Sequence, residues 1–252
     1  GQYRLPLPLQ AERDFRSLPD RPQKIGVELR LTAGGKELWR GLLNREVRTV
    51  TDLPRNEFSD RPNFILNRFG QVTRLVPSAT ENEPRYWKGP DDLSAEVKMA
   101  IRKNALLLRI EAKDNIHCQP YKAEESWKGD NVQCALLLPG QSSLWEIGLT
   151  RLANGKPEVW VWMAPNGFSC EKTASRIKLT TERDETRKTT VYQAEIPFES
   201  IGLSERIGRR GFLFNLLIND NDGEGRDNAI WIAPGNTEEK ALGRFPTILR
   251  FR

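Results

Sequence analysis

Carboxylates, amides and glycines crowd one short segment of this chain, residues 218–230 (INDNDGEGRDNAI). An apolar run at residues 211–218 leads into the segment and another at 229–233 follows it, so we expect a polar loop at the rim of a β-sheet. Four acidic residues in the loop supply the oxygen ligands that calcium prefers: Asp220, Asp222, Glu224 and Asp227. Nothing in the segment resembles a nucleophile or a catalytic base, which indicates binding of a cation or a polyhydroxylated ligand.

The spacing of these acids begins like an EF-hand loop, but its twelfth position is Trp231, where an EF-hand needs a bidentate Glu. The segment is therefore no EF-hand. A different calcium site stays open as a hypothesis, and Asp114, at the end of a predicted strand, could join it. The alternative is ordinary turn chemistry, in which Asp and Asn side chains cap backbone groups.

Other catalytic or metal-binding chemistry finds little support. His117 is the only histidine, no Gly-x-Ser-x-Gly elbow is present, and we expect His117 to lie in a surface loop. The three cysteines, Cys118, Cys134 and Cys170, are too few and scattered for a disulfide framework or a zinc site, although one pair could bridge in an oxidising compartment. Carboxylate pairs for glycoside hydrolysis can come from distant strands, but no motif nominates one.

Composition sets the broad class. The 252 residues fit one large β domain, or a main domain with a smaller companion, and seven Trp and ten Phe allow a packed core. The 39 basic and 34 acidic residues are interspersed, and without a reading motif they argue against nucleic-acid binding. No stretch approaches the roughly 18 apolar residues of a membrane span. The chain starts at Gly1 without a signal-peptide layout, and we expect an excised mature fragment.

The first part of the chain differs from the rest. Prolines punctuate its start, and apolar residues then alternate as in a half-buried strand, at Ile25, Val27, Leu29 and Leu31. A turn at Gly34-Gly35 lets residues 36–50 return as the partner strand; a helix over 36–47 is the alternative, weakened by Gly41. We therefore predict a small N-terminal β segment, or the tail of a preceding domain, at residues 1–60.

Residues 61–252 are expected to form the main domain. Short strand-like runs separated by turn signals repeat along it, at residues 71–76, 95–100, 105–112, 131–138, 144–151, 158–163, 176–180, 189–197, 211–218, 229–232 and 247–251. One helical turn is expected at residues 197–203. This pattern predicts an all-β sandwich or barrel.

Six motifs in order resemble the family nine carbohydrate-binding modules over roughly residues 69–252: 87–95 (WKGPDDLSA), 106–114 (LLLRIEAKD), 127–133 (WKGDNVQ), 192–198 (YQAEIPF), 214–220 (FNLLIND) and 244–251 (RFPTILRF). The resemblance implies a jelly-roll-like antiparallel β-sandwich that binds saccharides without cleaving them. Members often carry structural calcium and are appended to enzymes that degrade plant polysaccharides. A secreted, periplasmic or cell-surface location and flanking domains are implied as well.

The resemblance also implies site residues. Trp127 falls at the first of two tryptophans that clamp a sugar ring, and Gln133 falls where a glutamate contacts sugar hydroxyls. Arg226 lies in the loop of a ligand-binding arginine, after a one-residue gap. Asn236 matches a binding asparagine before the last strand.

The second clamp tryptophan is missing, because residues 236–244 contain no aromatic side chain where it should stand, near Glu239. This absence puts specificity for a chain end in doubt. Tyr121, six residues before Trp127, is our own candidate for the second wall, without support from the family.

The tryptophans have competing interpretations. The polar neighbours of Trp127 favour an exposed platform, whereas burial against the sandwich core is the alternative. Trp160 and Trp162 share one strand face and are expected in the core, with a flat binding platform as the alternative. Trp145 and Trp231 lie in apolar runs and are also expected in the core.

Three functions follow from these observations. The first is non-catalytic binding of an oligo- or polysaccharide as an accessory module, with calcium as an optional ion. The second is a structural or protein-interaction sandwich that has lost sugar binding, which a buried Trp127 would favour. The third is a hydrolase or lyase, marked by two facing carboxylates in a cleft. A haem-binding relative would need axial ligands from His117, Met99 or Met163.

Overall fold

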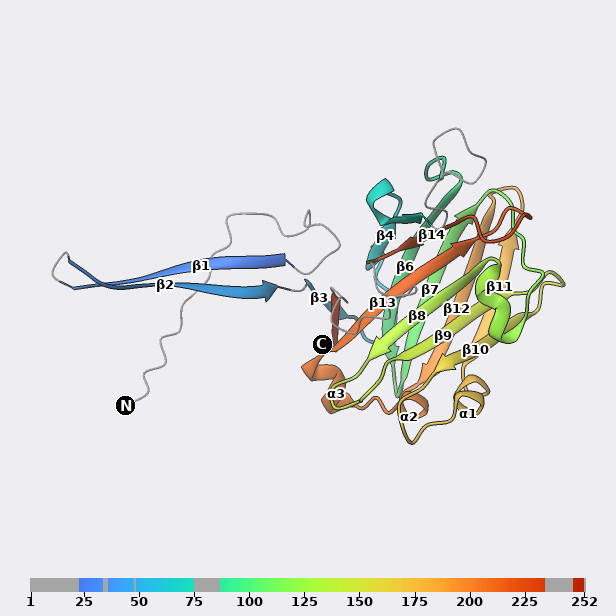
Figure 1. Ribbon diagram of the computed structural model, residues 1–252. Helices are drawn as coiled ribbons and strands as arrows, with labels where there is room; N and C mark the ends of the chain where they lie inside the picture. Colours follow the sequence, from blue (N-terminus) through green and yellow to red (C-terminus); the bar gives the residue numbers. More distant parts are fainter. Residues whose placement is uncertain (1–22, 34–35, 48, 75–86, 234–246, 252) are drawn as a thin grey trace.

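The computed structural model describes residues 23–33, 36–47, 49–74, 87–233 and 247–251 (Figure 1). Two β-sheets pack face to face over most of the chain, so the predicted all-β sandwich is confirmed. Each of the eleven strands expected after residue 69 is present. Asn236 lies outside the described residues.

The larger sheet has eight strands, of which six run in the order β10-β9-β8-β13-β14-β5, while β15 pairs with β13 and β3. Its strands are β3 (Thr49–Leu53), β5 (Val72–Arg74), β8 (Asn131–Leu137), β9 (Trp145–Arg151), β10 (Pro157–Met163), β13 (Phe212–Asp220), β14 (Asn228–Trp231) and β15 (Thr247–Phe251). All neighbours in it are antiparallel except β15 and β3, which are parallel. The predicted antiparallel β-sandwich is confirmed, with the β15–β3 pair as a parallel exception.

The smaller sheet has five antiparallel strands in the order β11-β12-β7-β6-β4. They are β4 (Phe64–Leu66), β6 (Leu93–Arg102), β7 (Ala105–Asp114), β11 (Lys178–Asp184) and β12 (Thr189–Pro197). In β12, alternate residues are buried because one face meets the other sheet: Thr190, Tyr192, Ala194 and Ile196. The core between the sheets is aliphatic and aromatic, and it includes Trp145, which is fully buried as expected.

Short helices close the ends of the sandwich. They are α1 (Cys170–Ala174), α2 (Phe198–Ile201) and α3 (Glu205–Arg210), with the 3-10 segments η2 (Phe69–Gln71) and η3 (Ala123–Lys128). The helical turn predicted at residues 197–203 is α2, and Gly202 ends it with a φ of 71°. None of the helices in the described ranges is long and apolar enough to cross a membrane.

The N-terminal strands form a separate hairpin. β1 (Gln23–Ala33) and β2 (Lys36–Val47) pair antiparallel, so the strand reading of residues 36–47 holds and the helix alternative is wrong. Figure 1 shows the hairpin extending away from the two sheets. β3 lies before the expected boundary at residue 61, and its pairing with β15 attaches it to the sandwich.

A glycine lets α3 pack closely on the last strand. A Cβ on Gly208 would lie 2.0 Å from the ring of Phe251, which stacks on Phe198 with ring centroids 5.2 Å apart. We expect Gly208→Ala to lower the free energy of unfolding by about 1–3 kcal/mol, because overpacking forces the aromatic cluster apart. Urea denaturation measures the change. Gly70→Ala is the matched control, since a Cβ at Gly70 meets nothing within 4 Å. Equal midpoints for the two variants would contradict this packing.

Candidate functional site

Trp127 lies on the surface at the rim of the sandwich. It belongs to η3, between β7 and β8, and 38% of its surface is exposed. The exposure agrees with the prediction from its polar neighbours. An indole is a large flat apolar surface with one hydrogen-bond donor, so in an exposed position it suits stacking on a ligand.

Two cationic side chains lie near this indole, and one of them also lies near the Tyr121 ring. The guanidinium carbon of Arg226 lies 5.4 Å from the Trp127 ring centroid. The Lys128 ammonium lies 5.8 Å from the same ring and 5.8 Å from the ring of Tyr121. These distances are within the range of cation–π attraction. The fold therefore brings together three of the predicted sugar-binding residues, Tyr121, Trp127 and Arg226.

A buried amide fixes the loop that carries Trp127. The Gln119 amide nitrogen donates to the carbonyl oxygens of Ser126 and Asp130, both at 2.9 Å, and its oxygen accepts from the Tyr121 N–H at 3.1 Å. A Cβ on Gly129 would lie 2.3 Å from this amide oxygen, so the loop needs glycine there. Tyr121 and Trp127 are thus held by one side chain.

Strand β10 contacts the same loop through the side chain of Trp162. The Trp162 indole covers Gly148, where a Cβ would lie 2.5 Å from the ring, and its Nε1 donates to the Glu124 carbonyl at 2.9 Å. Trp160 and Trp162 are half-buried, so their expected place in the core is wrong. The reason is the strand parity, because Val161 between them enters the core. Trp231 is likewise half-buried rather than in the core.

Gln133 occupies a less open place. It lies on β8 opposite Gly148 and Leu217, and only 6% of its surface is exposed. Its contact with a sugar hydroxyl stays a prediction.

Carboxylates gather beside this platform, where β7 and β13 end. Asp114, Asp220 and Asp222 have ligand oxygens within 4.8 Å of one another. Asp220 is 1% exposed, and its Oδ1 has no hydrogen-bond partner in the described part of the chain. Burial raises the pKa of Asp220 well above its usual range, and the Asp130 and Asp114 carboxylates raise it further. Carboxylate oxygens held this close together are suited to a hard cation.

The predicted metal ligands are only partly brought together. Asp220 and Asp222 belong to the cluster, and Asp114 joins them as expected. Asp227 is buried, and its carboxylate accepts from the Asp222 N–H at 3.0 Å, which is turn chemistry. Glu224 is exposed. Sequence reasoning missed Asp130, whose carboxylate lies 3.1 Å from Nδ1 of His117.

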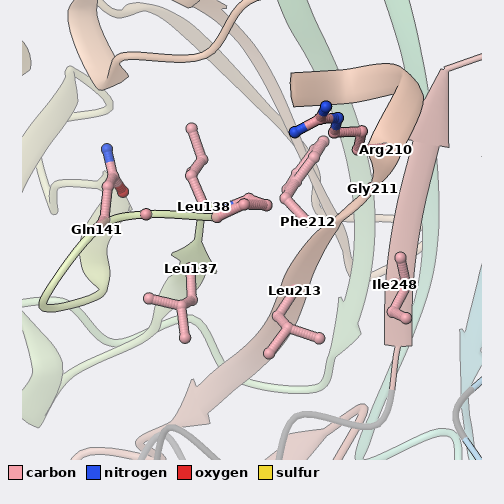
Figure 2. A pocket seen from close by; sticks show the side chains of 10 residues that line it. Leu137, Leu138, Gln141, Arg210, Gly211, Phe212, Leu213 and Ile248 are labelled. Carbon is pink, nitrogen blue, oxygen red and sulfur yellow. The ribbon is translucent and has the colours of Figure 1, made fainter. Parts of the chain in front are cut away.

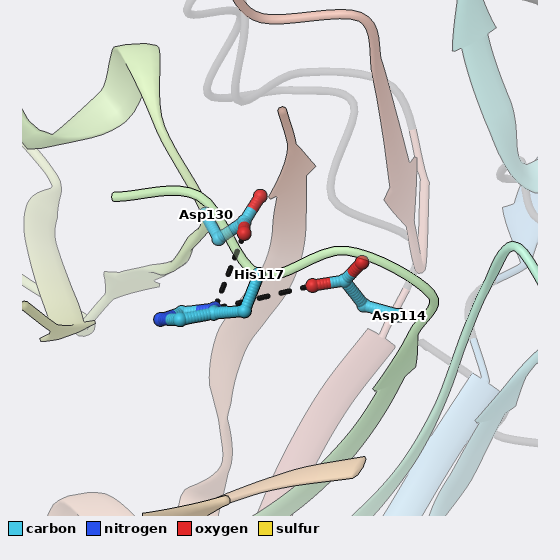
Figure 3. Close-up of side chains that lie close together, drawn as sticks. All are labelled: Asp114, His117 and Asp130. Carbon is cyan, nitrogen blue, oxygen red and sulfur yellow. Dashed lines mark ion pairs between the residues drawn. The ribbon is translucent and has the colours of Figure 1, made fainter. Parts of the chain in front are cut away.

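His117 lies inside the rim rather than in a surface loop, so that expectation is wrong. Its side chain is 6% exposed, and Figure 3 shows it between Asp114 and Asp130. Nε2 lies 3.0 Å from the Arg151 carbonyl oxygen, which can only accept, so Nε2 carries a proton. Nδ1 lies 3.1 Å from the Asp130 carboxylate. Burial lowers the pKa of His117 and raises the pKa of Asp130, so burial disfavours the charged form of each group.

One buried cation partly balances the acids. The Arg183 side chain is 1% exposed, lies 3.6 Å from the Asp114 carboxylate and donates to the Asp114 carbonyl at 3.0 Å. Asn221 then joins the cluster to the platform. Its N–H donates to the Asp130 carboxylate at 2.7 Å, and its amide donates to the Lys128 carbonyl at 2.9 Å. The acidic cluster and the Trp127 platform are therefore one connected structure.

Two hollows lie elsewhere on the sandwich. One of about 290 Å³ lies between the β8–β9 turn, β13 and β15, and Figure 2 shows Leu137, Leu213 and Ile248 around it. The other, of about 670 Å³, lies between β10, β11 and α1 and includes Trp160 and Cys170. Neither is lined by a predicted sugar-binding or metal residue.

All three cysteines are free thiols.

No family model matches the chain, and no curated protein matches it. Among solved structures, a family nine carbohydrate-binding module from Caldicellulosiruptor kristjanssonii in complex with cellotriose is 16% identical, with a TM-score of 0.47 over 82% of this chain and 94% of that one. The module from the same organism in complex with glucose is also 16% identical, with a TM-score of 0.46 over 82% of this chain and 95% of that one. A candidate carbohydrate-binding protein from Bacteroides uniformis is 11% identical, with a TM-score of 0.52 over 81% of this chain and 100% of that one. This last likeness shows a shared fold, the β-sandwich.

Proposed function

We propose that this chain is a non-catalytic carbohydrate-binding module, an accessory part of a larger secreted, periplasmic or cell-surface protein that processes polysaccharides. One observation carries the proposal: the exposed indole of Trp127 has Tyr121 and Arg226 gathered around it. The solved structures with a similar fold include modules in complex with cellotriose and glucose, which agrees with this function.

The chemistry of the platform matches a sugar ring. A pyranose presents an apolar face of C–H groups, which stacks on an indole, and hydroxyls at its edge, which pair with amide and guanidinium groups. Trp127 supplies the stacking surface and Arg226 the edge donors. Gln133 and Asn236 are the proposed further contacts to hydroxyls. The Gln119 amide holds the loop before the ligand arrives, which reduces the entropy lost on binding.

The described residues favour binding over catalysis. A glycosidase needs two carboxylates that flank a bond of the substrate. Here Asp114, Asp130 and Asp220 are at most 5% exposed. His117, the single histidine, is occupied by the Arg151 carbonyl and the Asp130 carboxyl. The alternative, a sandwich that has lost sugar binding, is disfavoured by the exposure of Trp127 and the polar groups beside it.

We further propose that calcium binds at Asp114, Asp220 and Asp222. The fit rests on the donor set, which is all oxygen, and on the buried Oδ1 of Asp220 without a hydrogen-bond partner among the described residues. Bound calcium would supply positive charge to the cluster. These residues would hold the ion. Asn221 would link the bound ion to the Trp127 loop, because it donates hydrogen bonds to both Asp130 and Lys128.

Replacing Trp127 tests the sugar platform. We expect a glycan array in calcium buffer to show selective binding by the native chain and at least about tenfold weaker binding by Trp127→Ala, because the stacking surface is lost. Phe168→Ala is the control, since Phe168 is an aromatic residue of similar exposure, 37%. Thermal midpoints show whether each variant is folded. Native binding that survives in Trp127→Ala would place the site elsewhere, and no binding to any glycan would support the scaffold alternative.

Calcium is tested by thermal unfolding. Saturating calcium should raise the midpoint by about 5–10 °C over EDTA, because the ion binds only the folded state. Asp220→Asn should lose most of this increase and, in EDTA, should be at least as stable as the native chain, since it removes a carboxyl group whose ionisation is disfavoured by burial and by neighbouring acids. Asp60→Asn, at an exposed position, should respond to calcium like the native chain. An unchanged midpoint in calcium would refute the site.

The pH dependence in EDTA follows from the same carboxylates. Burial and the Asp130 carboxylate raise the pKa of Asp114 from 3.8 to about 8. Between these two pKa values the folded protein keeps a proton on Asp114 that the unfolded chain has released. The contribution of Asp114 to the free energy of unfolding is therefore fully present below about pH 4 and is lost as the pH rises toward 8. We expect the midpoint in EDTA to fall between about pH 5 and about pH 8 and calcium to suppress the fall. A midpoint that rises with pH in EDTA would contradict this assignment.

A further inference from the structure

We propose that the saccharide bound at Trp127 is anionic, with a carboxylate or sulfate group on or next to the stacked ring. This inference rests on the proposed function and adds the class of its ligand. The observation behind it is that two cationic side chains, Arg226 and Lys128, lie within 6 Å of one exposed indole ring, at 5.4 Å and 5.8 Å.

The loop that carries Arg226 separates its charges. Asn221 folds the loop back, because its side-chain oxygen accepts from the N–H groups of Gly223 and Gly225 at 2.8 and 3.2 Å. Both glycines have positive φ, 115° and 106°, which a residue with a side chain rarely adopts. The fold turns the carboxylates of Asp220 and Asp227 into the protein, where they are 1% and 4% exposed.

The guanidinium of Arg226, in contrast, reaches the indole. A loop that is acidic in sequence therefore presents a cation to the ligand platform. Glu224 is the exposed acid of this loop.

Lys128 strengthens the positive field at the platform. Its ammonium lies 5.8 Å from both the Trp127 and the Tyr121 ring, so it is close to both proposed walls. It also pairs with Glu125, with side-chain exposures of 38% and 55%. Such an exposed ion pair contributes little free energy in water, so an anionic ligand can compete for the ammonium.

The ligand class follows from the donors. Arg and Lys only donate hydrogen bonds, whereas a sugar hydroxyl both donates and accepts. A carboxylate or sulfate only accepts, so it matches a guanidinium and an ammonium better than a hydroxyl does. Arg226 is already packed on the indole, so little side-chain entropy is lost when it binds an anion. A ring that stacks on Trp127 and carries an anionic substituent at its edge uses both features.

Two matched tetrasaccharides test the inference by isothermal titration calorimetry on the full chain. A β-1,4-linked glucuronic acid tetramer differs from cellotetraose only at C6, where a carboxylate replaces the hydroxymethyl group, and sulfated cellotetraose distinguishes sulfate from carboxylate. We expect an anionic ligand to bind at least about tenfold tighter than cellotetraose at low salt. The preference should shrink in high salt, because exposed charges are screened.

Variants identify the cation. Arg226→Gln should remove most of the anionic preference, and Arg226→Lys should keep part of it. Arg102→Gln is the control with the same change of charge, on the smaller sheet at an exposed arginine, and should bind like the native chain. Trp127→Ala should weaken binding of all the ligands.

Other outcomes overturn the inference in distinguishable ways. Equal or tighter binding of cellotetraose, lost in Trp127→Ala, refutes the anionic preference and leaves the carbohydrate-binding function standing. Equal effects of Arg226→Gln and Arg102→Gln show that only the overall charge matters, which also refutes it. Binding of the anionic ligands that Trp127→Ala does not weaken reveals a nonspecific polyanion surface. If none of these ligands and no arrayed glycan binds, the proposed function itself fails.

Discussion

The rim of the sandwich is built around carboxylates held close together out of water. Asp114, Asp130 and Asp220 are all at most 5% exposed, and the Asp130 carboxyl raises the pKa of the other two. Burying like charges is among the most costly arrangements in a protein, so the surrounding structure must compensate. The Arg183 guanidinium, the His117 ring and the N–H groups of Cys118 and Asn221 supply that compensation. The ends of β7, β8 and β13 are positioned by these contacts.

The ligand platform depends on this compensation. Asp130 accepts from Asn221 through its carboxylate and from Gln119 through its backbone carbonyl. Those two amides in turn hold the carbonyls of Lys128 and Ser126, on either side of Trp127. A change in the charge of the cluster, by proton or by metal, therefore acts on the loop that presents the indole. Buried hydrogen bonds of Gln119 and Asn221 therefore position Trp127, while its indole ring is exposed.

The sequence predicts the scaffold better than the site. Strands such as β12 and β15 match their predicted ranges, because alternation and turn residues are local signals. The short strands β3 and β4 escape prediction, since three to five residues carry too little periodicity and β3 is placed by parallel pairing with β15. His117 and Asp130 are thirteen positions apart in sequence and meet only when β7 and β8 close the rim. Their pairing is a tertiary fact that spacing along the chain does not encode.

The missing second tryptophan takes on a different meaning once the platform is assembled. In a clamp of two indoles, recognition rests on the two apolar faces of the ring. Here Arg226 and Lys128 both lie within 6 Å of one indole ring, and Lys128 also lies 5.8 Å from the Tyr121 ring. If this is the proposed sugar site, charge at the edge of the ring would give it directionality in place of a second stack.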